Sequence, residues 1–134
     1  MAEHHPDVCP QLSDVLREMD IAFLVAGEYG ITVEEASKFI DHDHFIFLDV
    51  RTHEEAKTLT FSFAQHIPLN ELPDRLDEVP HNKFIITFCL SGFRASMAYT
   101  YLRTQGYDEI KALKGRLDQL AGAMTPGRFY QLHP

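Results

Sequence analysis

Residues 83–94 of this chain are Lys83-Phe84-Ile85-Ile86-Thr87-Phe88-Cys89-Leu90-Ser91-Gly92-Phe93-Arg94. The first six are mostly apolar and aromatic, which is typical of a strand covered on both faces. A cysteine ends this run, with a glycine three residues later and an arginine five residues later. The stretch therefore raises the question whether the Cys89 thiol is packing material or a nucleophile.

Apolar patterns on both sides of this stretch alternate between strand and helix. Residues 45–50 form a second continuous apolar run, and residues 64–68 and 109–113 are shorter strand candidates. Apolar residues recur at helical spacing in residues 72–79, before Pro80, and in 95–102, before Gly106. Strands that alternate with helices predict a single α/β domain with a mainly parallel sheet and helices on both faces.

Helix starts are indicated by two possible capping boxes. Thr32 is followed by Glu35, and Thr52 by Glu55, so helices are expected directly after residues 32 and 52. The tail, residues 124–134, is interrupted by proline and glycine and is expected to be irregular.

The N-terminal part carries an apolar stripe of its own. Residues 12–23 have apolar side chains at helical spacing, which predicts one amphipathic helix ended by Gly27 and Gly30. Because this stripe is too apolar to be left in water, we expect it to pack on its own domain. A homodimer interface is the alternative.

Composition limits the class of protein. The chain has 134 residues, 45% hydrophobic and 24% charged, and no apolar run approaches the ~20 residues that a membrane span needs. No secretory signal is seen at the N-terminus, so a cytoplasmic location is expected. Cys9 and Cys89 show no pairing pattern, which favours reduced thiols.

Charge and histidine spacing make other partners unfavourable. A net charge of −8 works against binding to nucleic acid or anionic membrane, since both rely on clustered Lys and Arg. Among the eight histidines only His4-His5 and residues 42–44 group tightly, without a second ligand pair. We expect neither a metal nor an organic cofactor.

The position of Cys89 fits a nucleophile. Functional groups of parallel sheets collect where strands end, and a helix that begins near Arg94 would turn loop N–H groups toward the sulfur and favour the thiolate. Gly92 supplies backbone freedom, and Arg94 adds a charge suited to an anion. The alternative is a small buried hydrophobic residue. Cys9 has no comparable surroundings.

Four ordered segments resemble the rhodanese family of sulfurtransferases. Residues 89–96 resemble its C-x-x-G-x-R-[SA] active-site loop, and residues 47–55 are similar to its aliphatic-D-V-R-x-x-x-E segment. His66-Ile67-Pro68 is similar to its G-H-I-P turn, and residues 107–115 to the strand before its glycine turn. The resemblance runs from about Ile31 to Ala121 and implies a rhodanese-like domain over residues 31–134, preceded by an extension over 1–30.

The resemblance implies sulfur transfer through a persulfide on Cys89. The donor would be thiosulfate, a polysulfide or a small or protein-bound persulfide, and the acceptor a thiol. The residues implied in substrate binding belong to the loop: Leu90, Ser91, Gly92, Phe93 and Arg94. Asp49 and Arg51 either border the active site or form a salt bridge that ties the loop. His66 is expected to be a structural hydrogen-bond partner, and Ser91 and Ser96 either bind the anion or cap the helix.

Departures from the family pattern keep two further functions open. Leu90 stands where many active members have a basic residue, and Arg116 replaces a glycine, which favours a noncatalytic binding or regulatory module as the alternative. A small phosphatase or arsenate reductase is disfavoured, because four residues separate Cys89 from Arg94 and phosphatases of this fold have five. The apolar rim of Leu90 and Phe93 favours polysulfide or persulfide over thiosulfate.

Overall fold

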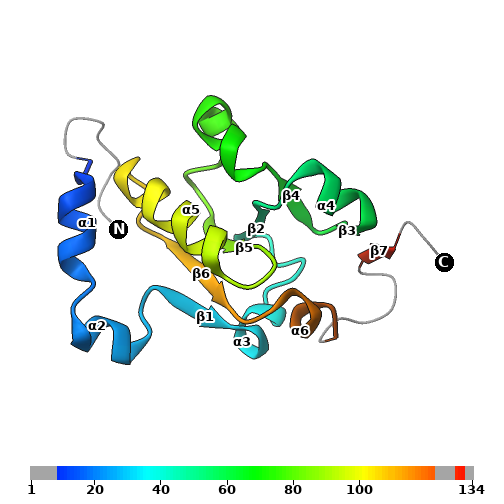
Figure 1. Ribbon diagram of the computed structural model, residues 1–134, viewed down its shortest axis with the longest axis horizontal. Coiled ribbons are helices and arrows are strands. Elements are labelled where there is room, and N and C mark those ends of the chain that lie inside the picture. Colours follow the sequence, from blue (N-terminus) through cyan, green and yellow to red (C-terminus); the bar gives the residue numbers. More distant parts are fainter. Residues whose placement is uncertain (1–8, 123–128, 132–134) are drawn as a thin grey trace.

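The central sheet of the computed structural model has five parallel strands in the order β1-β6-β5-β2-β4 (Figure 1). The structure describes residues 9–122 and, for the backbone, residues 129–131. The strands are β1 (Gly30–Thr32), β2 (Phe45–Asp49), β4 (Ala64–His66), β5 (Phe84–Phe88) and β6 (Ile110–Lys114). The predicted α/β fold with a mainly parallel sheet is confirmed.

Helices cover both faces of this sheet. Along β5, Ile85 belongs to the core beneath α5 (Phe93–Thr104), whereas Ile86 and Phe88 belong to the opposite core, with α3 (Val33–Ser37) and α6 (Leu117–Gly122). Because side chains alternate along a strand, Cys89 is placed on the α5 face together with Ile85. The alternation therefore brings the sulfur under the first turn of α5.

The predicted helix starts after Thr32 and Thr52 are confirmed. Thr52 and Glu55 form a full capping box at the start of α4 (His53–Thr58), with the Thr52 hydroxyl accepting from the Glu55 N–H at 3.2 Å and the Glu55 carboxylate accepting from the Thr52 N–H at 2.8 Å. At Thr32 only the hydroxyl half of the box is made, by a 3.2 Å bond from the Glu35 N–H.

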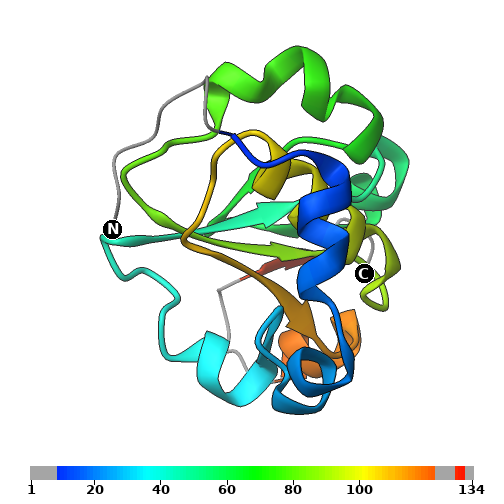
Figure 2. The same cartoon turned by 90° about the vertical axis from the view of Figure 1, so that its left-hand side faces the viewer.

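The predicted single helix over residues 12–23 is wrong. The chain forms α1 (Leu12–Glu18) and α2 (Ile21–Ala26), separated by Met19 and Asp20. The Asp20 carboxylate accepts a 2.9 Å hydrogen bond from the Phe23 N–H, so it caps α2 instead of continuing α1. Figure 2 shows α1 lying in front of α5, against which it packs.

Several shorter elements also differ from the prediction. β1 was not expected, and the helix predicted over residues 72–79 is a 3₁₀ helix, η2 (Leu69–Glu78), which contains Pro73. The tail was expected to be irregular, but β7 (Phe129–Gln131) pairs antiparallel with the unpredicted β3 (Leu59–Phe61). The rest of that tail, residues 124–128 and 132–134, lies outside the described residues. In the described ranges no helix has the length and apolar character to cross a bilayer.

Candidate active site

Two backbone N–H groups point at the sulfur of Cys89. Gly92 donates to Sγ at 3.2 Å and Ala95 at 3.3 Å, where the loop turns into α5. The Cys89 side chain is also buried, with 3% of its surface exposed. The thiol is therefore both a core residue and the centre of a backbone cradle of the kind that stabilises anions.

The shape of the cradle is fixed by the backbone conformation at Gly92 and by two hydrogen bonds to neighbouring segments. Gly92 has φ 102°, in the left-handed region, and a Cβ there would meet only the Leu113 carbonyl at 3.9 Å. The backbone angle, rather than a lack of space, is what favours glycine. The buried Thr87 hydroxyl donates to the Ala95 carbonyl at 2.8 Å, and the Leu117 N–H donates to the Leu90 carbonyl at 2.9 Å. The sequence does not predict these two hydrogen bonds, because each joins segments that come together only in the folded chain.

Arg94 does not present an unpaired charge. Its guanidinium makes a two-pronged ion pair with Glu55, at 2.6 and 2.8 Å, and each side chain is about a quarter exposed. The hydrogen bonds from Arg94 lower the pKa of Glu55 from 4.5 to about 2, and Glu55 raises the pKa of Arg94. The sequence predicts Glu55 as a capping residue and places it in the segment that resembles the D-V-R-x-x-x-E pattern, but it does not predict the pairing with Arg94. This pairing fixes α4 to the active-site loop.

Asp49 and Arg51 form a buried salt bridge. The Arg51 guanidinium contacts the Asp49 carboxylate at 2.7 and 2.9 Å, and a further bond of 2.8 Å joins it to the Leu59 carbonyl. The His66 ring contacts the Arg51 carbonyl at 2.8 Å, in the structural role that the sequence predicts. These contacts tie the end of β2 to β3 and β4. A role of Asp49 and Arg51 at the border of the active site stays a prediction.

The outer rim of the loop is apolar. Leu90 is 46% exposed and Phe93 is 74% exposed, and Ser91 lies between them on the surface. Beyond Leu90 lies a hollow of about 380 Å³ that Arg116 also lines, but this arginine is paired with Asp118 at 3.1 Å. Arg94 and Arg116 thus both have carboxylate partners, and the groups that donate directly to the Cys89 sulfur are the backbone N–H groups of Gly92 and Ala95.

Within residues 9–122 the structure places no group of three or more His, Cys, Asp or Glu side chains that could hold a metal ion. Neither cysteine is part of a disulfide.

Comparisons with known proteins agree with this geometry. A sulfurtransferase of Allochromatium vinosum is 29% identical over 80 residues, which are 60% of this chain and 75% of that protein. A tRNA uridine(34) hydroxylase of Erwinia tasmaniensis is 27% identical over 101 residues, and the chain covers only 29% of that protein's length. The crystal structure of SSP1007 from Staphylococcus saprophyticus superposes with a TM-score of 0.61 at 29% identity, over 68% of this chain and 91% of that one. The model of the rhodanese-like domain matches residues 32–123, more than half of the chain, which therefore belongs to the rhodanese family.

Proposed function

We propose that this chain is a sulfurtransferase that carries sulfane sulfur as a persulfide on Cys89. The observation that supports this most directly is the pair of N–H groups, from Gly92 and Ala95, that donate to Sγ at the start of a 12-residue helix. Such a cradle stabilises a thiolate, which is the nucleophilic form of cysteine. The similarity to a sulfurtransferase supports the same activity.

The reaction has two half-reactions. The Cys89 thiolate attacks the outer sulfur of the donor, the sulfur–sulfur bond of the donor breaks, and its electron pair leaves with the donor's remaining group. An acceptor thiolate then attacks the outer sulfur of the Cys89 persulfide, and Cys89 leaves as a thiolate. Because the enzyme holds the sulfur between the two steps, ping-pong kinetics are expected.

The same backbone groups serve both halves of the cycle. The two N–H groups that donate to Sγ stabilise negative charge on that atom, both when it attacks the donor and when it leaves the persulfide as a thiolate. Since Arg94 is paired with Glu55, its contribution is to hold the loop in place more than to supply an unpaired charge.

Intact-mass spectrometry tests this proposal. After exposure to polysulfide or thiosulfate, the wild type and Cys9→Ser should each gain one sulfur, and Cys89→Ser should gain none. Sulfur found chiefly on Cys9 would overturn the assignment of Cys89.

A noncatalytic binding or regulatory module is the second candidate. It is supported by the 3% exposure of Cys89, by the pairing of Arg94 with Glu55 and by Leu90 at the rim. The two functions differ in turnover: a sulfurtransferase transfers the Cys89 sulfur repeatedly to an added thiol, whereas a noncatalytic module does not. Steady-state assays with polysulfide and a thiol acceptor distinguish them.

A further inference from the structure

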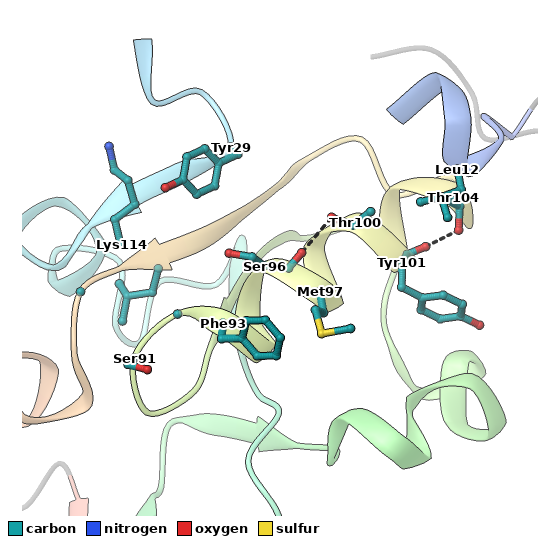
Figure 3. A pocket seen from close by; sticks show the side chains of 13 residues that line it. Leu12, Tyr29, Ser91, Phe93, Ser96, Met97, Thr100, Tyr101, Thr104 and Lys114 are labelled. Atoms are coloured by element: carbon teal, nitrogen blue, oxygen red, sulfur yellow. Dashed lines mark hydrogen bonds between the residues drawn. The ribbon is translucent and has the colours of Figure 1, made fainter. Parts of the chain in front are cut away.

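A groove runs along α5 beside the active-site loop. Its volume is about 780 Å³, within the range of sites that bind small molecules. Figure 3 shows Ser91 at one end, Leu12 and Thr104 at the other, and Tyr29 and Lys114 on the side opposite α5. We call this the α5 groove.

The lining of the α5 groove is apolar although it faces solvent. Phe93 is 74% exposed, Leu12 is 54% exposed and Met97 is 50% exposed, and Tyr29 and Tyr101 also line the groove. Exposed apolar side chains that gather in one hollow mark a binding site more often than scattered ones do. Aromatic and thioether side chains suit a ligand with an aromatic or branched apolar body.

Lys114 provides a cation at the side of this groove. Within residues 9–122 it makes no salt bridge, whereas Arg94 and Arg116 are paired with Glu55 and Asp118. Its side chain lies against the backbone of the N-terminal segment, since a Cβ at Gly30 would come within 2.3 Å of the Lys114 Cγ. Lys114 is thus held beside the groove without a salt-bridge partner among these residues. An anionic group of a ligand in the groove could pair with its ammonium group.

The α5 groove lies directly beside the loop residues that surround the Cys89 sulfur. Ser91, Gly92 and Phe93 close one end of the groove, and the N–H of this same Gly92 donates to the Cys89 sulfur. Leu12 and Tyr29 lie before residue 32, where the match to the family begins. The N-terminal segment therefore contributes part of the α5 groove, next to the loop that carries Cys89.

We propose that the α5 groove binds the organic body of the sulfur donor, a hydropersulfide R–S–SH whose R group is aromatic or similarly bulky and carries one anionic group for Lys114. This inference rests on the proposed function. The Cys89 thiolate attacks the outer sulfur of the donor and the S–S bond breaks. The RS⁻ group keeps the electron pair, the transferred sulfur becomes the outer atom of the Cys89 persulfide, and its proton passes to RS⁻ or to water.

Donor kinetics provide the first test. The probes are methyl hydropersulfide, benzyl hydropersulfide and the hydropersulfide of 4-(mercaptomethyl)benzoate. We expect kcat/KM to rise about tenfold from methyl to benzyl, because the ring leaves water for an apolar surface. The carboxylate should add a severalfold gain that Lys114→Gln removes.

Substitutions at two equally exposed residues provide the control. Met97 and Leu24 are each 50% exposed, but only Met97 lines the groove. Met97→Gln should lower the benzyl-to-methyl ratio of kcat/KM at least fivefold, and Leu24→Gln should leave this ratio as in the wild type. Equal rates for benzyl and methyl donors, or an equal effect of both variants, would refute the groove as the donor site.

Binding without transfer separates this inference from the proposed function. The thioether 4-(methylthiomethyl)benzoate has no sulfur to give, and titrated into Cys89→Ser it should shift the NMR signals of Met97, Tyr29 and Lys114. If these signals shift but no donor loads Cys89 in the wild type, the sulfurtransferase proposal fails and the binding site stands. If Cys89 loads normally but the thioether shifts none of the three signals, the groove proposal fails alone, and a protein partner becomes the candidate occupant.

Discussion

The number of arginines near Cys89 overstates the unpaired positive charge there, because neighbouring carboxylates pair with these arginines. Arg94 belongs to the loop and Arg116 lines the hollow beside Leu90, yet each is paired with a carboxylate, from Glu55 and Asp118. A dianionic donor such as thiosulfate therefore meets backbone N–H groups and an apolar rim, without an unpaired arginine. This makes position 90, on that rim, the residue at which added charge should change donor choice.

The substitution Leu90→Arg should raise kcat/KM for thiosulfate severalfold at low salt. Leu90 is 46% exposed, and one charge at such a site contributes about 1 kcal/mol or less to anion binding. The wild type should prefer polysulfide. Steady-state kinetics with both donors check this, with Leu90→Gln as the control for loss of the leucine alone. A thiosulfate-to-polysulfide ratio that is the same in Leu90→Arg and Leu90→Gln would contradict the prediction.

A second prediction concerns the ion pair of Glu55 and Arg94. The pKa of Glu55 is about 2 in the folded chain and 4.5 in the reference state, so the stabilisation is complete above pH 4.5 and is lost as the pH falls toward 2. Glu55→Gln should lower the free energy of unfolding by about 1–2 kcal/mol at pH 7, after allowance for solvent screening. The gap between variant and wild type should close between pH 4.5 and 2.

Urea unfolding at pH 7, 4 and 2.5 measures this difference. Glu54→Gln is the matched control, since Glu54 is exposed on the same turn of α4. The ion pair would be of no consequence for stability if both variants unfolded at the same urea concentration at pH 7.

Among the elements, those with a strong local pattern could be predicted from the sequence. β2 and β5 are continuous apolar runs, and α4 begins at a capping box, so their existence follows from neighbouring residues. β1 and β3 were not predicted, and β3 depends on pairing with β7 far along the chain. The break between α1 and α2 was missed because Asp20 fits the polar side of one long helix as well as the cap of a second.

In the candidate active site, too, only features that depend on neighbouring residues could be predicted from the sequence. The position of Cys89 and the turn at Gly92 could be predicted, because strand, cysteine and glycine are consecutive in the sequence. The pairing of Arg94 with Glu55 spans 39 positions, and the α5 groove combines residues from both ends of the described chain. Such contacts depend on tertiary packing, which local patterns do not contain.

Packing of α1 on α5 leads to a prediction for two neighbouring residues. Val15 is fully buried, whereas Leu16 is 52% exposed on the same helix. Val15→Ala should lower the free energy of unfolding by about 2 kcal/mol, since buried methyl groups are lost and a cavity remains. Leu16→Ala should change it by about 0.5 kcal/mol or less. Equal effects in urea unfolding would mean that α1 is not held against α5 in solution.

For the whole molecule, the N-terminal segment links the stability of the domain to the candidate active site. α1 is held by Val15 and by a two-pronged ion pair of Glu18 with Arg103, at 2.8 and 2.9 Å, while Leu12 and Tyr29 line the α5 groove. In contrast, α2 has no buried residue, and Ile21 is 76% exposed. The segment thus covers its own domain with α1 and leaves an apolar surface on α2.

Removal of residues 1–20 should therefore destabilise the domain without changing its assembly. We expect a melting temperature lower by about 5 °C or more, because the contacts of Val15 and Glu18 are lost together. Light scattering should give a monomer mass for both the full chain and the shortened one, since the buried side of α1 is already used within the chain. A dimer mass for the full chain that falls to a monomer on truncation would instead assign the segment to a homodimer interface. Unchanged mass and melting temperature would show that it has neither role.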